Sequence, residues 1–165
     1  MIVLKNITPA LTASLKEARL SALKEAPSAF GSTYEQESQL SAAEWLERAS
    51  AMSLANAVGY LALDGERICG MVRGELDEAN PLRAQVASMW VAPECRKSGI
   101  ATQLLAAVQR WASCSGVREL ILTVTNSNEA AIALYSRHGF QPTGRTEPYP
   151  NDADLFEIEM LKPVI

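Results

Sequence analysis

The sequence predicts an α+β fold built on a mixed sheet, and three observations support this. Residues 57 to 76 read as two strands joined at Asp64-Gly65, a pair that supplies the positive backbone angles of a tight hairpin. Further along, a helical pattern over residues 99 to 114 is followed by a buried strand over residues 119 to 126. The chain has 165 residues, nearly half of them apolar, which suits one buried core. We therefore expect a single domain over residues 1–165.

The N-terminal third is predicted to be mainly helical. Residues 2 to 7 form a short strand, and Thr8-Pro9 then opens a helix that ends before Pro27. Ser41 and Glu44 have the spacing of a capping box, which predicts a second helix over about residues 42 to 50, anchored by its apolar residues. The apolar positions of the two helices are Leu11, Leu15, Ala18, Ala22, Leu23, Trp45 and Leu46.

A third strand follows the hairpin, and its pattern is irregular. In the run LRAQVASMWVAP, the apolar positions Ala84 and Val86 are out of phase with Met89 and Val91. Because side chains alternate strictly in a regular strand, this slip of one residue predicts a bulge near Ala87 or Ser88.

The remaining elements alternate between helix and strand. Gly116 ends the helix over 99 to 114, and a further helix from Glu129 ends at Gly139. The segments from Phe140 and from 155 to 161 are predicted to be the last strands.

Composition excludes several classes of function. With 15 Lys and Arg against 19 Asp and Glu, the net charge of −4 argues against general binding of nucleic acid or anionic membranes. No segment reads as a membrane span or a signal peptide, so we expect a soluble, cytoplasmic protein. Cys69, Cys95 and Cys114 form no C-x-x-C pair and predict neither a disulfide framework nor a metal site. Cys95 precedes a basic loop, where its pKa could fall, but a nucleophilic role lacks an activating partner.

The loop APECRKSGIA, between the third strand and the helix over 99 to 114, has the composition of an anion site. Free N–H groups and the helix dipole favour negative charge at a helix start. Gly99 and Ala101 let a ligand approach the backbone, and Arg96 and Lys97 add charge suited to the phosphates of coenzyme A. The plain alternative is a solvated surface turn.

A second motif follows, NEAAIALYSRHGF from Asn128 to Phe140. Together with VAPECRKSGIA it closely resembles the GCN5-related N-acetyltransferase (GNAT) family, whose members show V-x-P-x-x-R-x-x-G-x-G/A and then N-x-x-A-x-x-L-Y-x-x-x-G-F. The motifs cover residues 89 to 140, and Ala101 stands where Gly is frequent. The resemblance implies a mostly antiparallel sheet with a splayed parallel strand pair, flanked by helices, and acetyl-CoA as co-substrate.

The resemblance also implies site residues. Backbone groups of Met89 and Val91 would hold the pantetheine arm, Asn128 would hydrogen-bond it, and Tyr135 would serve the sulfur. Pantetheine is an extended amide chain and can pair like an added strand. The amides from Arg96 through Thr102 would hold the pyrophosphate. The full set expected to bind the co-substrate is Met89, Trp90, Val91, Arg96, Lys97, Ser98, Gly99, Ile100, Ala101, Thr102, Asn128, Ala131 and Tyr135.

Acetyl transfer to an amine requires a neutral nucleophile, a stabilised oxyanion and a proton for the departing thiolate. Tyr135, with an ordinary pKa near 10, can donate to a thiolate whose conjugate acid lies near 8.5. For the general base, Glu75 is the first candidate, and Asp77 and Glu78 are rivals. The backbone N–H of Met89 or of Trp90 would serve the oxyanion. His138 is interpreted as a helix-end residue whose charge complements the dipole.

The acceptor is open among aminoglycosides, polyamines, free amino acids and protein N-termini. Acidic residues near the expected acceptor wall favour a cationic or polar amine. The residues considered for that wall are Phe30, Tyr34, Tyr149, Glu35, Glu37 and Asp152. The main hypothesis is an amine acetyltransferase, and the rival is a non-catalytic acyl-CoA-binding sensor or interaction module. Apolar residues in the last strands suggest a homodimer as a further hypothesis.

Overall fold

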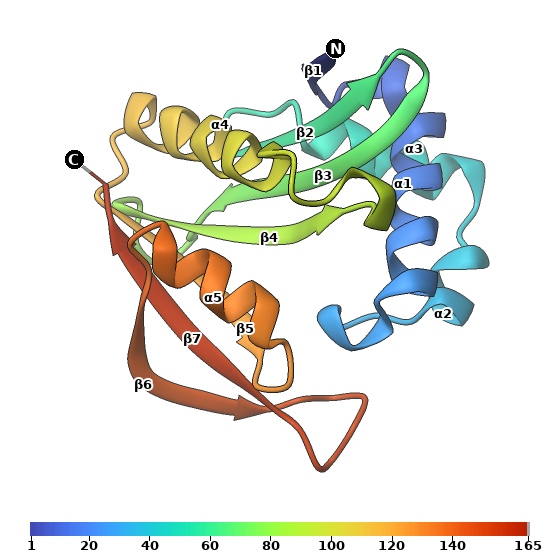
Figure 1. Ribbon diagram of the computed structural model, residues 1–165. Coiled ribbons are helices and arrows are strands. Elements are labelled where there is room, and N and C mark those ends of the chain that lie inside the picture. Colours follow the sequence, from blue (N-terminus) through green and yellow to red (C-terminus); the bar gives the residue numbers. More distant parts are fainter. Residues whose placement is uncertain (165) are drawn as a thin grey trace.

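A seven-stranded sheet with helices on both faces is the framework of the protein in the computed structural model, which describes residues 1–164 (Figure 1). The strands are β1 (Ile2–Asn6), β2 (Ala57–Asp64), β3 (Arg67–Leu76), β4 (Arg83–Val91), β5 (Glu119–Thr125), β6 (Gln141–Pro148) and β7 (Phe156–Pro163). The helices are α1 (Thr12–Glu25), α2 (Tyr34–Ser38), α3 (Ala42–Ala51), α4 (Ile100–Cys114) and α5 (Glu129–Arg137), with single 3-10 turns η1 (Pro9–Leu11), η2 (Pro27–Ala29) and η3 (Pro93–Cys95).

The strand order is β1-β2-β3-β4-β5-β7-β6. All neighbouring strands run antiparallel except β4 and β5, which are parallel. This arrangement confirms the predicted α+β class with one parallel pair in a mostly antiparallel sheet. The Asp64-Gly65 hairpin is confirmed, with Gly65 at a φ of +63°.

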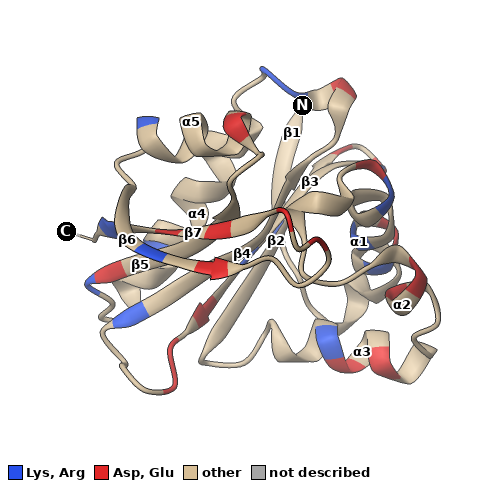
Figure 2. Ribbon diagram, turned by 90° about the horizontal axis from the view of Figure 1, so that it is seen from below, with Lys and Arg blue, Asp and Glu red and all other residues tan. Residues whose placement is uncertain are grey.

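The helices divide between the two faces of the sheet (Figures 1 and 2). Helix α4 packs on one face of β3, where glycines allow it to approach closely. A Cβ added at Gly74 would lie 3.0 Å from side-chain atoms of Trp111 and Val108 of α4. Side chains alternate along a strand, so Met71 and Arg73 face the opposite side, where α1 and α3 lie.

The predicted bulge in β4 is confirmed. Met71 of β3 pairs with Trp90, but Arg73 pairs with Ala87, so β4 has one residue more than β3 over this interval. Ser88 lies within the extra segment and has a φ of +56°, in the left-handed region. A bulge bends the strand that carries it, so β4 changes direction near Ser88.

The helix boundaries follow local signals. Ser41 and Glu44 form the expected capping box at the start of α3. A second capping box, between Thr33 and Gln36, starts the short helix α2, whose bounds the sequence pattern did not predict. No helix within residues 1–164 is both long enough and apolar enough to cross a membrane.

Candidate functional site

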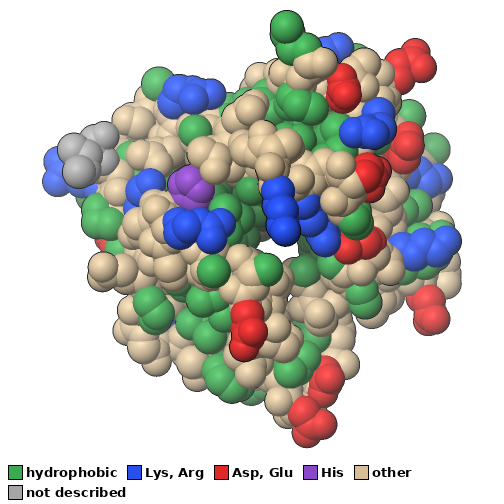
Figure 3. All heavy atoms as spheres, in the orientation of Figure 1, with side chains coloured by type: hydrophobic (Ala, Val, Ile, Leu, Met, Phe, Trp, Pro, Cys, Tyr) green, Lys and Arg blue, Asp and Glu red, His purple; other side chains and the backbone are tan. Residues whose placement is uncertain are grey.

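The two parallel strands separate soon after they meet. β4 and β5 pair at only three positions, from Arg83 with Glu119 to Gln85 with Ile121. Beyond these pairs the strands diverge, so the facing edges of residues 86 to 91 and 122 to 125 do not bond each other. The molecular surface is hollowed between β4 and the part built on β5 to β7, and Lys and Arg side chains gather at the rim (Figure 3).

The alternation of hydrogen bonds along β4 shows which backbone groups face this gap. The N–H of Ala92 donates to the carbonyl of Cys69 on β3, at 2.9 Å. In an antiparallel pair the next residue must turn its groups the other way, so Val91 faces β5 and Trp90 faces β3. Two backbone N–H groups were considered as oxyanion donors, those of Met89 and Trp90. The N–H of Trp90 lies within the β3–β4 ladder, whereas that of Met89 faces the gap.

A row of free N–H groups lies at the open end of the gap. Among the described residues, the backbone N–H groups of residues 97 to 102 have no hydrogen-bond acceptor, and the first bonded amide of the helix is that of Gln103, to Gly99. Gly99 has a φ of +83°, and a Cβ added there would meet no atom within 4 Å. Lys97 also has a positive φ, of +61°. Six donors at one helix N-terminus form a site suited to a pyrophosphate.

Arg96 is committed elsewhere. Its guanidinium donates to both carboxylate oxygens of Glu25, at 2.9 and 3.0 Å, and its Nε donates to the Val91 carbonyl. Glu25 also accepts the indole N–H of Trp90 at 2.9 Å. Glu25 therefore offsets the charge of Arg96, and the expected contribution of this side chain to phosphate binding stays a prediction. Its place is to tie η3 to the end of α1.

The second motif lies across the gap, in α5. Asn128 caps this helix, and its Oδ1 accepts the N–H of Ala131 at 3.2 Å, which leaves its amide N–H groups available to a ligand. Tyr135 packs edge-to-face on Phe140, with the ring centroids 5.8 Å apart. Burial raises the pKa of Tyr135 to about 12, so the phenol is protonated at neutral pH.

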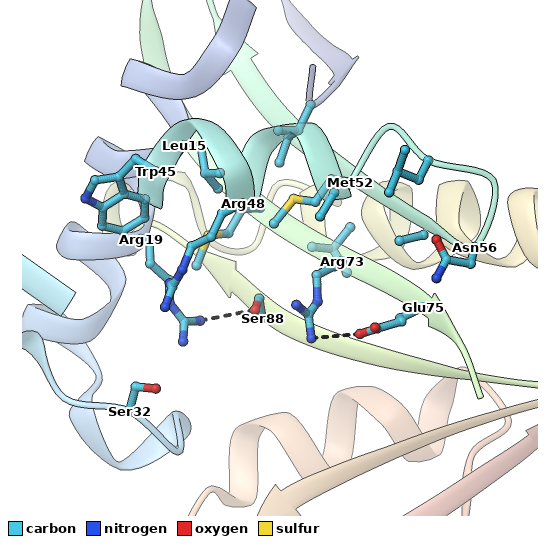
Figure 4. A pocket seen from close by; sticks show the side chains of 16 residues that line it. Leu15, Arg19, Ser32, Trp45, Arg48, Met52, Asn56, Arg73, Glu75 and Ser88 are labelled. Carbon is cyan, nitrogen blue, oxygen red and sulfur yellow. Dashed lines mark hydrogen bonds and ion pairs between the residues drawn. The ribbon is translucent and has the colours of Figure 1, made fainter. Parts of the chain in front are cut away.

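A cavity of about 410 Å³ lies on the α1 and α3 side of the sheet (Figure 4). It reaches Ser88 at the bulge, and its charged lining residues are Arg19 from α1, Arg48 from α3 and Arg73 and Glu75 from β3. Glu75 is an ion-pair partner of Arg73, at 3.2 Å.

The three candidate bases separate clearly. Only Glu75 lines the cavity. Asp77 accepts the N–H of Ala79 in the turn after β3, and Glu78 is exposed on that turn.

None of the six residues considered for the acceptor wall lines this cavity. Glu37 is buried and held by Arg19 and Arg48, at 2.9 and 2.5 Å. Burial opposes its ionisation, but the hydrogen bonds and charges of these two arginines outweigh burial and hold the pKa of Glu37 below its usual value. Tyr149 is buried, and its hydroxyl donates to backbone carbonyls at Pro27 and Phe30. Phe30, Tyr34, Glu35 and Asp152 are likewise absent from the cavity lining.

The pKa shifts at Cys95 and His138 differ from the sequence interpretation. Burial, with a contribution from Cys69, raises the pKa of the Cys95 thiol instead of lowering it, in line with the absence of a partner that would activate a nucleophile. Partial burial, followed by the charges of Lys162 and Arg137, lowers the pKa of His138. Its neutral ring contacts the Thr102 hydroxyl at 3.0 Å instead of placing a charge at the helix end. Within residues 1–164, no group of His, Cys, Asp and Glu has the arrangement of a metal site.

The sequence interpretation missed the three arginines of the cavity. One signal was present in α1, where Arg19 lies four residues after Leu15 and among Ala18 and Ala22 on the apolar side. Another was the position of Arg73 inside a strand that is otherwise mostly apolar.

Comparisons with known proteins agree with this arrangement. A family model described as the Acetyltransferase (GNAT) family matches residues 20–140. N-alpha-acetyltransferase 30 of Schizosaccharomyces pombe is 34% identical over 100 residues, which cover 59% of this chain and 67% of that protein. Aminoglycoside N(6′)-acetyltransferase type 1 of Salmonella typhimurium is 37% identical over 57 residues, 34% of this chain and 39% of that protein. The chain thus spans about two thirds or less of these curated relatives.

A solved structure shares the fold over nearly the whole chain. The GNAT superfamily phosphinothricin acetyltransferase from Sinorhizobium meliloti, in complex with acetyl-CoA, has a TM-score of 0.81 and covers 99% of this chain and 88% of its own. Its sequence identity is 20%, so this likeness concerns the fold. The match over residues 20–140 includes the diverging strands, the free N–H groups and the second motif. The chain therefore belongs to the acetyltransferase (GNAT) family of N-acetyltransferase enzymes.

Proposed function

We propose that this protein transfers the acetyl group of acetyl-CoA to a primary amine by direct attack in a ternary complex. The observation that carries the proposal is that three features share β4 and the loop that follows it: the free N–H groups of residues 97 to 102, the gap between β4 and β5, and the cavity that reaches Ser88 at the bulge. The free N–H groups suit a pyrophosphate, the gap suits an extended amide chain, and the cavity suits a small acceptor. A relative of the same fold binds acetyl-CoA, which supports the assignment.

In this mechanism the backbone of β4 holds the thioester. The N–H of Val91 faces the gap and donates to a pantetheine amide. The carbonyl of Val91 already accepts a hydrogen bond from Arg96 Nε. The N–H of Met89 stabilises the oxyanion that forms when the amine nitrogen attacks the thioester carbon. Asn128 donates to the pantetheine arm from the opposite side of the gap.

Proton transfers complete the reaction. Glu75 takes a proton from the alkylammonium, directly or through water, so that a neutral amine can attack. As the new C–N bond forms and the C–S bond breaks, Tyr135 donates its proton to the departing thiolate. The attacking nitrogen releases its second proton to water, and the Tyr135 phenolate takes a proton back from water. This phenol is protonated at neutral pH, because burial raises its pKa to about 12.

The first prediction is that acetyl-CoA-dependent thiol release occurs with at least one primary amine in a screen that includes amino acids, peptides, polyamines and aminoglycosides. The acetylated amine should be identified by mass spectrometry, with release stoichiometric with product. Saturable binding of acetyl-CoA, with no product from any amine, would instead identify a non-catalytic acyl-CoA-binding module.

A further inference from the structure

We propose that the acceptor carries a carboxylate, or a similar oxyanion, beside its primary amine, and that Arg48 and Arg73 bind this anionic group. The inference rests on the proposed function and names the class of acceptor for the same site. Its simplest form is a free amino acid whose amine points toward the bulge of β4.

The charge of the cavity supports an anionic ligand. Three arginines line it, and Glu75 is its one acidic lining residue. Glu37 lies behind the wall, with 3% of its side chain exposed, and is shared by Arg19 and Arg48. The carboxylates of Glu37 and Glu75 balance two of the three arginine charges. One positive charge therefore has no counter-ion, so the cavity attracts anions and repels cations.

Free hydrogen-bond donors point to the same conclusion. Arg19 uses its donors on Glu37 and on Ser88 Oγ. Arg48 and Arg73 each make one ion pair, through Nη1 and Nη2 respectively, although a guanidinium carries five N–H groups. The Nε of Arg73 is buried and has no acceptor among the described residues. A carboxylate can accept two parallel N–H bonds from one guanidinium, which would satisfy such a donor.

The position of these donors sets the spacing within the acceptor. Arg73 pairs across the sheet with Ala87, and Arg19 Nη1 lies 3.1 Å from Ser88 Oγ. Arg73 and Arg19 therefore lie at the bulge (Figure 4), and Arg48 lies beside Arg19, with which it shares Glu37. An anionic group bound here lies a few bonds from an amine that attacks at the gap. This short spacing is that of an α-amino acid.

The size and remaining lining of the cavity fit such a molecule. Its volume of about 410 Å³ falls at the small end of ligand pockets, which hold about 300 to 1,000 Å³. Trp45, Met52, Leu54 and Met71 supply apolar surface for a side chain. A polyamine or an aminoglycoside would instead bring several positive charges against three arginines, so the expectation of a cationic acceptor loses its basis.

The experiment compares free L-amino acids with their C-terminal amides as acceptors, measured as kcat/KM for thiol release. We expect the best amino acid to exceed its own amide by at least about tenfold. The amide loses the negative charge that raises the pKa of its amine, so intrinsic reactivity favours the amide and opposes the expected result. Tripeptide amides with the same first residue form a third arm.

Variants assign the effect to residues. Arg73→Gln and Arg48→Gln should each reduce the preference for acid over amide by about tenfold, while Kd for acetyl-CoA changes by less than about twofold. Arg83→Gln is the matched control. Arg83 is also a sheet arginine with one carboxylate partner, Glu119, and a buried Nε without an acceptor, but it lies outside the cavity. The Arg83→Gln variant should keep the native preference for acid over amide.

A binding arm separates the two proposals. With coenzyme A present, the amino acid should raise the melting temperature more than its amide does. Equal shifts, or faster acetylation of amides, tripeptide amides or polyamines, would overturn the carboxylate inference and leave the acetyltransferase proposal intact. Selective binding of amino acids without acetylation of any amine would overturn the acetyltransferase proposal alone.

Discussion

At the scale of single residues, Tyr135 has an environment very different from that of an exposed tyrosine. Its ring is buried and packs on Phe140, and no side-chain hydrogen bond of its hydroxyl is found among the described residues. A donor that has no partner in the free enzyme is available to a ligand atom in the gap. Burial raises its pKa to about 12, so the phenol is protonated at neutral pH but is a weaker acid than an exposed tyrosine.

Tyr135→Phe tests this role, because it removes one hydroxyl and keeps the packed ring. We expect Kd for acetyl-CoA to change little and kcat to fall by roughly 10² to 10⁴, the usual effect of a positioned general acid. Single-turnover kinetics should be used, so that chemistry limits the rate. A thioester with a less basic leaving thiol should recover part of the loss. Unchanged turnover would show that the phenol is structural and that another group donates the proton.

At the scale of elements, a contact between α1 and η3 holds the start of the loop that carries the free N–H groups of residues 97 to 102. Glu25 is the last residue of α1, an unfavourable place for a negative charge next to the helix dipole. It is compensated by Arg96 and by the indole of Trp90, on the two sides of the loop start. These bonds fix η3 before the six free N–H groups begin, so a change at Glu25 should affect the loop without touching the ligand.

Glu25→Gln should therefore weaken binding of acetyl-CoA by about 3- to 10-fold and lower the free energy of unfolding by about 1 kcal/mol, since the charge-assisted bonds are partly exposed. The value of kcat at saturating acetyl-CoA should remain within about twofold. Glu17→Gln is a suitable control, because Glu17 is exposed on the same helix and forms no ion pair among the described residues. Calorimetric titration measures the affinity, and native affinity in Glu25→Gln would contradict the loop-positioning role.

At the scale of the whole molecule, the sheet consists of two parts joined at a narrow seam. Strands β1 to β4 form one part and β5, β7 and β6 the other, and only three residue pairs connect β4 with β5. A ligand that pairs with both free edges would add bonds across this seam.

The hypothesis of a homodimer stays a prediction at this scale. The outer strand β6 is exposed and has Pro142, Pro148 and charged residues, which oppose edge-to-edge pairing.

Acetyl-CoA should consequently stabilise the folded protein. At 100 times Kd, the stabilisation is about 2.7 kcal/mol, or roughly 5 to 10 °C in melting temperature for a chain of this size. Gly99→Glu should abolish the shift, because it places bulk and negative charge where the loop is open and where φ is positive. Gly144→Glu is the matched control for strain, since Gly144 also has a positive φ and open surroundings but lies on β6. A native-sized shift in Gly99→Glu would contradict the loop assignment.

The order of strands and helices could be predicted because its signals are local. The Asp64-Gly65 pair, the Ser41–Glu44 capping box and the phase slip in β4 each act within a few residues, and all three are confirmed. The paired motifs identified the family for a similar reason, since free N–H groups and a left-handed glycine at a helix start are properties of a short segment. The expectation of acetyl-CoA as co-substrate followed from that resemblance.

Only the tertiary structure decided which side chains face the reacting groups. Arg19, Arg48 and Arg73 come from α1, α3 and β3, and no spacing within the sequence brings them together. The charge of Arg96 was cancelled by Glu25, 71 residues away, and that of Glu37 by arginines from two helices. Charge effects fall off over a few ångströms and depend on burial, so their sign at a site is set by neighbours in space. The sequence by itself determined the fold and the loop of residues 92 to 101, whereas the charge of the cavity lined by Arg19, Arg48 and Arg73 depended on packing between distant elements.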